Sequence, residues 1–245
     1  MLKTCCKNIM ETSTVSLAQG YGTEDPSYPL YRLYDRNIGR PFKTTSAVTT
    51  QIKVDQGTSP LAVDRLLIPA GHNLGGLTLA VLYSDNGADW SYAATDWTAG
   101  SGVIDKSWAA ATRRWWLVSI NAPTAPPSIP ELFLTQTYTW ERCILKTGPL
   151  DSLFNVERAE SASGLVRFLV KGDPRRQRVY HVSHAGETQK SNIAALNDVW
   201  KGACPFWLYD HEGNWLFGEL RKPIDLKETA YRTYSFEFDF LEVLP

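Results

Sequence analysis

The stretch from Cys204 to Leu220, CPFWLYDHEGNWLFGEL, decides the fold of the second half of the chain. Phe206 to Tyr209 and Trp215 to Phe217 are dense aromatic and apolar runs, which are typical of buried strands. Between them, His211 to Asn214 favour a turn, because Gly and Asn tolerate a positive φ. The stretch therefore predicts a β-hairpin, and Gly218 is expected to loosen its second strand.

Two further elements flank this hairpin. Gln189 to Trp200 precedes it with apolar residues at a helical spacing, and Gly202 and Pro205 are expected to end that helix. Tyr234 to Val243 follows it, with aromatic residues that alternate with Ser, Glu and Asp. This alternation predicts a strand with one buried aromatic face and one wet acidic face. The order of helix, hairpin and strand predicts a β-sandwich with one helix, at about residues 189–201.

This arrangement, with its PFWLYD strand, its NW turn and its closing YSFEFDFLEV strand, resembles the β-sandwich of distal and minor tail proteins of long-tailed phages. The likeness covers residues 143–245. An unrelated all-β domain is the alternative. The resemblance implies a structural role in a phage tail tip, where such proteins assemble as closed rings.

The first half of the chain alternates short apolar runs with Gly, Pro, Asn and Asp, which favours an all-β sandwich or jelly roll. Turns are predicted at Asp55-Gln56-Gly57, Gly71-His72-Asn73 and Asp85-Asn86-Gly87. The predicted strands are 51–54, 63–69, 77–84, 114–120 and 130–137.

The order of these strands and turns, with the SDNGADW segment at Ser84 to Trp90, resembles a discoidin-type, galactose-binding-like domain. We therefore expect one jelly-roll domain over residues 1–142 and a second sandwich over 143–245. Members of this family often bind sugars or lipids through loops at one end of the jelly roll, and many are plain interaction modules. The fold alone does not establish a ligand.

A polar, aromatic segment from Trp90 to Trp108 is the candidate binding site, and we expect it to form a long loop. Aromatic rings stack on the apolar faces of sugars and carboxylates accept hydrogen bonds from their hydroxyls, so this composition suits a glycan. The alternative, which we favour, is that these tryptophans cap the sandwich or contact a neighbouring subunit. The predicted ligand residues are Trp90, Tyr92, Asp96, Trp97 and Trp108.

Two other segments invite an interpretation. Trp115 and Trp116 occupy consecutive strand positions and must point to opposite faces, so at most one lies in the core and a partner is expected to cover the other. Lys171 to Arg178 is the one concentrated basic run. We assign Arg175, Arg176 and Arg178 to an assembly interface or a solvated loop, although in a tail channel they would face passing DNA.

Composition and motifs exclude several classes of function. The chain has 245 residues and a formal net charge of −1, so no basic half indicates specific nucleic-acid binding. Its four cysteines form no disulfide framework, and the four histidines predict no metal cage or cofactor. No nucleophile motif or phosphate loop is present, so we predict that the chain is not an enzyme. We also expect neither a secretory signal nor membrane insertion.

The leading hypothesis from the sequence is a distal or minor tail protein of the virion, synthesised and assembled in the host cytoplasm. It would form a homo-oligomeric ring and contact tail-tube, hub and fibre proteins. The alternative is a carbohydrate-binding adhesin that recognises host glycans. A third hypothesis, a glycoside-acting tail enzyme, would need Asp89 or Asp96 for turnover.

Overall fold

The computed structural model divides the chain into two compact units. The N-terminal unit comprises Cys5–Thr137, and the C-terminal unit comprises Met1–Thr4 together with Tyr138–Leu244. The described residues are 2–121, 123–140, 143–145, 151–153, 156–160, 166–170, 175–186, 189–202, 204–210, 212–224, 227–231 and 233–243.

This division differs at both ends from the expected first domain of residues 1–142. Strand β1 (Leu2–Cys5) pairs antiparallel with β12 (Tyr138–Trp140), so that Leu2 lies opposite Trp140. Both strands belong to the sheet of the C-terminal unit. Pairing between residues so far apart in sequence leaves no local pattern, and for this reason the N-terminal residues were expected in the first domain.

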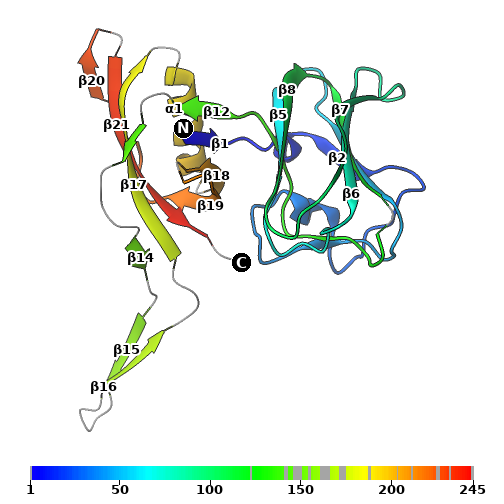
Figure 1. Cartoon of the computed structure of the whole chain (residues 1–245), viewed down its shortest axis with the longest axis horizontal. Helices are drawn as coiled ribbons and strands as arrows, with labels where there is room; N and C mark the ends of the chain where they lie inside the picture. The colour runs from blue at the N-terminus through cyan, green and yellow to red at the C-terminus, as the bar shows by residue number, and fades with distance from the viewer. Residues whose placement is uncertain are drawn as a thin grey trace. The chain divides into compact units, whose positions relative to one another are not determined.

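The N-terminal unit contains a five-stranded and a three-stranded antiparallel sheet (Figure 1). The five-stranded sheet has the order β2-β4-β9-β6-β7, and the three-stranded sheet has the order β11-β5-β8. Short strands β3 and β10 pair separately. The bounds are β2 (Thr14–Leu17), β3 (Phe42–Lys43), β4 (Thr50–Asp55), β5 (Ala62–Ile68), β6 (Thr78–Ser84), β7 (Ser91–Thr98), β8 (Ile104–Thr112), β9 (Trp115–Asn121), β10 (Ser128–Ile129) and β11 (Phe133–Thr135), with 3-10 helices η1 (Ile9–Thr12) and η2 (Leu30–Leu33).

The core of this unit lies between the two larger sheets. Alternate residues Ile52 and Val54 of β4 are fully buried, and so are Leu66 of β5 and Leu134 of β11. Trp116 is buried in the same cluster, whereas Trp115 is only partly buried, as their opposite strand faces predict. The β-sandwich prediction for this half is therefore confirmed.

The predicted turns have the expected backbone. Gly57, Gly71 and Gly87 have φ of 69°, 95° and 75°. These values lie in the left-handed region, which only glycine enters readily. At Gly87 a Cβ would also lie 3.0 Å from the Trp115 ring, so the turn between β6 and β7 requires glycine on two counts.

The C-terminal unit is built on one nine-stranded sheet, with β12-β1-β18-β19-β21-β17-β13 in line, β14 paired with β17 and β20 paired with β21. Its remaining bounds are β13 (Cys143–Leu145), β14 (Asp151–Leu153), β15 (Val156–Glu160), β16 (Val166–Val170), β17 (Arg175–Gly186), β18 (Phe206–Tyr209), β19 (Trp215–Leu220), β20 (Lys227–Ala230) and β21 (Thr233–Glu242), with the helix α1 (Lys190–Lys201). This confirms the helix, the hairpin and the final strand.

Aromatic packing holds the sheet core of this unit together. Along β21 the residues Tyr234, Phe236, Phe238 and Phe240 are buried and alternate with partly exposed polar neighbours. The Phe238 ring stacks on Tyr180 at 5.0 Å, and the Phe240 ring meets Phe206 edge-on at 5.5 Å. Burial of one such side chain contributes about 1.5–3 kcal/mol, and ring geometry adds about 0.5–1.5 kcal/mol.

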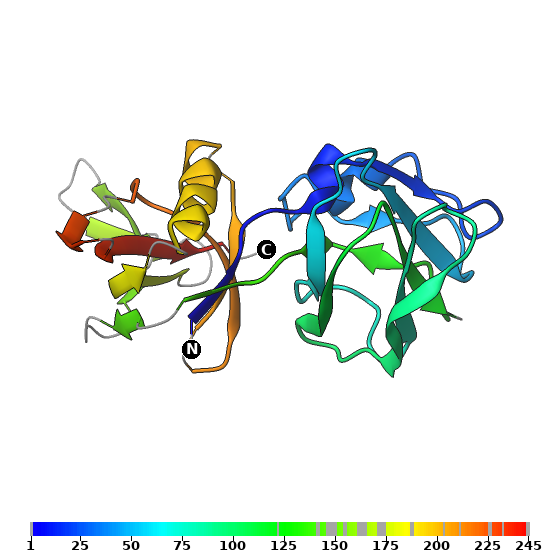
Figure 2. The same cartoon turned by 90° about the horizontal axis from the view of Figure 1, so that it is seen from above.

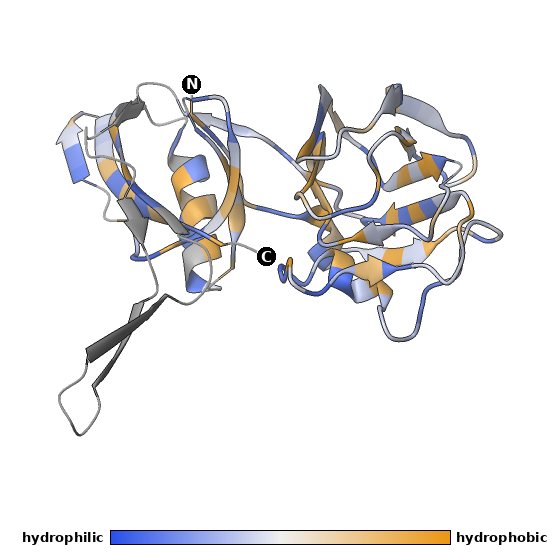
Figure 3. Cartoon of the chain, turned by 60° about the horizontal axis from the view of Figure 1, so that its bottom comes forward, coloured by the Kyte–Doolittle hydropathy of each residue, from blue (hydrophilic) through white to orange (hydrophobic). Residues whose placement is uncertain are grey.

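Helix α1 packs its apolar stripe against the sheet of the C-terminal unit, where it contacts β19 (Figures 2 and 3). Ile193, Leu196 and Val199 are buried at the spacing that the sequence predicted. The helix ends at Lys201, where the Gly202 N–H donates to the Asp198 carbonyl at 3.1 Å. The predicted termination is therefore confirmed.

Local contacts explain both the turn of the β18–β19 hairpin and the glycine in its second strand. The Asp210 carboxylate accepts hydrogen bonds from the N–H groups of Glu212 and Asn214 at 3.0 and 2.8 Å. Gly218 does more than loosen β19, because a Cβ there would lie 2.3 Å from the Leu241 carbonyl oxygen. Glycine at this position lets β19 and β21 approach each other.

Strands β15 and β16 form a hairpin of their own (Figure 1). Val156 lies opposite Val170 and Glu160 lies opposite Val166. The two strands pair with each other in a two-stranded sheet separate from the nine-stranded one. The start of the predicted basic run, at 171–174, lies outside the described residues.

Candidate functional site

The predicted binding loop is wrong, because most of the segment from Trp90 to Trp108 forms strands β7 and β8. Tyr92 pairs with Leu82 and Trp97 pairs with Leu79, so β7 completes the five-stranded sheet. The polar sequence SYAATDWT hid this strand, because its stability comes from pairing with β6 and not from its own hydrophobicity.

These strands divide the predicted ligand residues between two faces. Trp97 and Trp108 pack against the core, and the Trp108 Nε1–H donates to the Val63 carbonyl at 3.1 Å. The Trp108 ring also lies 5.9 Å from the ring of Trp116. Both tryptophans therefore stabilise the sandwich, which is the alternative that the sequence favoured.

The other three predicted residues lie on or next to β7. Tyr92 is 54% exposed, which makes it one of the few large hydrophobic side chains of the described residues that face solvent. Asp96 is also exposed, and Trp90 immediately precedes β7 with partial burial. Because Trp90 and Tyr92 are two residues apart, they project from the same face, about 7 Å apart along the strand.

That face is the outer side of the five-stranded sheet. The pairing places Lys53, Leu117, Leu82 and Tyr92 in one row across β4, β9, β6 and β7. Lys53 lies between the buried residues Ile52 and Val54 and must point away from the core. We call Lys53, Leu82, Trp90, Tyr92 and Trp115 the outer-face platform.

Cations surround the rings at one end of the platform. The Lys53 Nζ lies 4.3 Å from the centre of the Trp115 ring and 5.7 Å from that of Trp90, within the range of cation–π attraction. The same ammonium donates to the Gly87 carbonyl at 3.4 Å. The Arg114 guanidinium lies 5.0 Å from the Trp115 ring.

Trp115 is therefore partly covered by side chains of its own chain. Arg114 also donates two hydrogen bonds to the Asp55 carboxylate, at 2.8 and 3.0 Å. These bonds lower the pKa of Asp55, chiefly through the Arg114 side chain. The arrangement leaves Trp90 and Tyr92 as the aromatic side chains of the platform that a ligand can stack on.

The turn beside the platform satisfies its own polar groups. The Asn86 Oδ1 accepts from the N–H groups of Ala88 and Asp89, both at 2.9 Å. The Asn86 Nδ2 donates to the Asp89 carboxylate at 2.7 Å. These bonds are those of a hairpin turn, as the sequence predicted at Asp85-Asn86-Gly87.

Sequence reasoning did not find Lys53 or the Asp55–Arg114 pair. The position of Lys53 between two buried strand residues could have revealed its outward orientation, because strand residues alternate between faces. Its neighbours Trp90 and Trp115 come from distant parts of the sequence, so no local motif indicates them.

The proposed assembly arginines lie in a strand instead of a loop. Arg175 and Arg176 stand opposite Leu153 and Ser152 in the β14–β17 pairing. The Arg178 guanidinium bonds to the Glu212 carboxylate at 2.9 Å, and its side chain is only 11% exposed. Arg178 therefore serves first as an internal ion pair.

The described residues show no arrangement typical of a metal centre. In that part of the chain, no group of three or more His, Cys, Asp or Glu side chains converges as metal ligands would. Glu237 and Asp239 bond to His181 and Gln177 on the polar face of the sheet, at 3.2 and 2.8 Å. Within the same residues, the helix falls short of the length and apolarity that a membrane crossing requires.

No family model and no curated protein matches the chain. Among solved structures, it is similar to SpGH29 (17% identity, TM-score 0.45), with 54% of this chain and 28% of that chain covered. It is also similar to chitosan-binding module 1 from a chitosanase/glucanase of Paenibacillus sp. IK-5 (16%, 0.44, covering 54% and 99%). A third similar structure is the family 32 CBM from C. perfringens NanJ in complex with galactose (17%, 0.44, covering 55% and 99%).

Each likeness covers about half of this chain. The chain in turn spans 28% of the length of SpGH29 and nearly all of the two binding modules.

Proposed function

We propose that the N-terminal unit binds carbohydrate on the outer-face platform without chemical turnover. The observation that carries the proposal is the exposed ring of Tyr92 beside Trp90, on a face whose neighbouring side chains are fixed by cation–π contacts and hydrogen bonds. A rigid aromatic surface of this kind stacks on sugar rings at little entropic cost. Host-surface glycans are the proposed ligands.

A glycan array followed by calorimetry on the best ligand tests this function. Tyr92→Ala and Trp90→Ala should each weaken binding about tenfold, which corresponds to about 1.4 kcal/mol. Tyr21→Ala is the matched control, because Tyr21 is a 41% exposed tyrosine of the same unit that lies outside the platform. Unchanged affinity in both platform variants, or equal loss in the control, would rule the platform out as the binding site.

A second function is favoured by the β15–β16 hairpin. We propose that the chain is a structural component of a phage tail tip, in which copies form a ring and join the tube to hub or fibre proteins. An isolated two-stranded hairpin is only marginally stable in water, and its open edges invite pairing with another chain. Among the described residues this hairpin pairs with no further strand.

This second proposal places the protein in the virion tail after assembly in the host cytoplasm. DNA would pass through the lumen of the ring without specific recognition. Aromatic exposure gives this proposal little support, since the exposed aromatic side chains among the described residues are Tyr21, Tyr31, Tyr92 and Tyr231.

Light scattering combined with negative-stain imaging tests the ring. A closed ring should appear for the full chain and be lost when Arg167 in β16 is replaced by proline, which removes an N–H and fixes φ. Asp96→Asn, on the exposed surface of the other unit, should assemble like the unmodified protein. A monomer both alone and with purified tail-tube protein would count against this function.

A further inference from the structure

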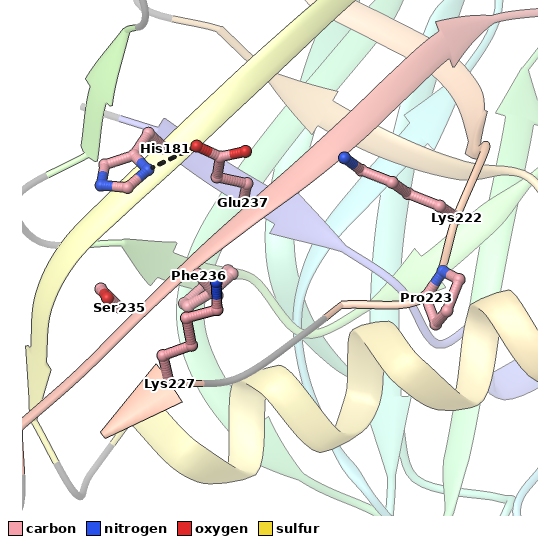
Figure 4. A pocket seen from close by; sticks show the side chains of 7 residues that line it. All are labelled: His181, Lys222, Pro223, Lys227, Ser235, Phe236 and Glu237. Atoms are coloured by element: carbon pink, nitrogen blue, oxygen red, sulfur yellow. Dashed lines mark hydrogen bonds and ion pairs between the residues drawn. The ribbon is translucent and has the colours of Figure 1, made fainter. Parts of the chain in front are cut away.

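The C-terminal unit carries a hollow on the polar face of β17 and β21 (Figure 4). Its volume is about 270 Å³. His181 comes from β17, Ser235 and Glu237 come from β21, and Lys222 and Lys227 come from the connection after β19 and from β20. Figure 4 shows both lysine side chains extending toward β21 from these separate segments.

Among the described residues that line this hollow, positive charges outnumber negative ones. These residues contribute two ammonium groups and one carboxylate, and the carboxylate also bonds to the imidazole, at 3.2 Å between His181 Nδ1 and Glu237 Oε1. The Ser235 hydroxyl and the imidazole add neutral hydrogen-bonding groups to the two cations. Cations that surround a small hollow, together with hydroxyl and ring N–H donors, are the usual chemistry for recognising an oxyanion.

We propose that this hollow binds a small oxyanion, a phosphate, sulfate or carboxylate group. The volume limits the size of the ligand, because pockets for drug-sized molecules run from about 300 to 1,000 Å³. The occupant is therefore a free oxyanion or one carried on a monosaccharide-sized molecule. The site lies in the other unit from the outer-face platform and does not depend on the carbohydrate-binding proposal.

Whether Glu237→Gln strengthens or weakens oxyanion binding distinguishes a specific oxyanion site from a surface that the substitution merely disturbs. Replacement of Glu237 by Gln removes the one negative charge among the described lining residues while keeping groups that can hydrogen-bond to His181. An oxyanion should then bind more tightly. A variant that only disturbed the strand would weaken binding.

The test is a titration of the full chain with sodium phosphate, glucuronate and glucose at constant ionic strength, followed by backbone amide NMR shifts. Lys222→Ala and Lys227→Ala should each weaken phosphate binding at least about threefold, and Glu237→Gln should strengthen it by a similar factor. Lys201→Ala, an exposed lysine of the same unit, should leave binding unchanged. Thermal melts of all variants establish that they are folded.

The outcomes separate the sources of the ligand. Phosphate that binds more tightly than glucuronate identifies a free oxyanion, and tighter glucuronate identifies an acidic sugar; either result supports the proposal. Glucose that binds as well as both anions overturns it. It is also overturned if both lysine variants bind phosphate normally, or if Glu237→Gln weakens binding.

Discussion

Glu131 is a buried acid whose replacement should change the pH dependence of stability. The residue is 0% exposed, and neither carboxyl oxygen has a hydrogen-bond partner of normal geometry among the described residues. Burial raises the pKa of Glu131 from its ordinary 4.5 to about 10, with Asp35 adding to the rise and the charge of Arg36 opposing it. The carboxyl is therefore protonated in the folded protein at pH 7.

The sign of the effect follows from this raised pKa. Between pH 4.5 and about 10 the folded state holds a proton that the unfolded state has released, so the free energy of unfolding falls as pH rises. Each pH unit costs about 1.36 kcal/mol, and roughly 2.5 units separate pH 4.5 from pH 7. The accumulated loss at pH 7 is about 3 kcal/mol.

Glu131→Gln removes this titration and keeps the shape of the side chain. Its free energy of unfolding should fall less steeply with pH than that of the unmodified protein, and the difference should grow by about 1.4 kcal/mol per pH unit above pH 5. Urea unfolding of the N-terminal unit at pH 5 to 9 measures it. The slope of the free energy of unfolding against pH is the readout. The new amide also brings N–H groups whose burial costs free energy, but that cost is the same at every pH and does not change the slope.

The exposed Asp96 supplies the control for this experiment. Asp96→Asn removes an exposed carboxylate of the same unit and is measured in parallel. Parallel profiles for the unmodified protein and Glu131→Gln would refute the reasoning, since they would mean that the carboxyl titrates alike in the folded and unfolded chain.

Three shorter predictions follow from individual contacts. Gly218→Ala should destabilise the C-terminal unit by about 1–3 kcal/mol in urea unfolding, because its Cβ would lie 2.3 Å from the Leu241 oxygen, whereas Gly100→Ala, with open space around it, should change little. Trp108→Phe should cost the N-terminal unit about 1 kcal/mol through the lost bond to Val63 and leave glycan affinity intact; a selective loss of affinity would return Trp108 to the binding site. Burial lowers the pKa of His72, whose ring nitrogens bond to the Gly102 carbonyl and the Leu74 N–H. The free energy of unfolding should therefore fall below pH 6.5, because the unfolded chain gains a proton there that the folded chain binds less readily. His72→Gln should make this fall less steep in urea unfolding.

The strands found from the sequence are those whose own residues record burial. Along β21 every second residue enters the core, so the aromatic alternation predicts both the strand and its buried face. The same holds for Ile52 and Val54 in β4. Turns were equally accessible, because a positive φ at Gly57 or Gly87 restricts the residue type locally.

Strands that depend on their partners for stability left no such record. The polar strand β7 depends on β6, and β1 depends on β12, whose residues lie more than 130 positions away. A strand that a neighbouring strand stabilises can have the amino-acid composition of a loop. This is why the sequence assigned one segment to a loop and the other to the wrong unit.

The same physical limit explains what could be known of the binding site. The sequence drew attention to the segment that contains Trp90 and Tyr92 of the proposed platform, but it could not show which face each side chain joins before the strand itself was recognised. Tyr92 is exposed, whereas Trp97, five positions later, falls on the core side. Two register shifts interrupt the alternation along β7, so the β6 partners decide the face: Leu82, opposite Tyr92, and Leu79, opposite Trp97, are three positions apart and point to opposite sides of the sheet. Lys53 completes the platform through register alone, which only the pairing of β4 with β9 and of β9 with β6 reveals.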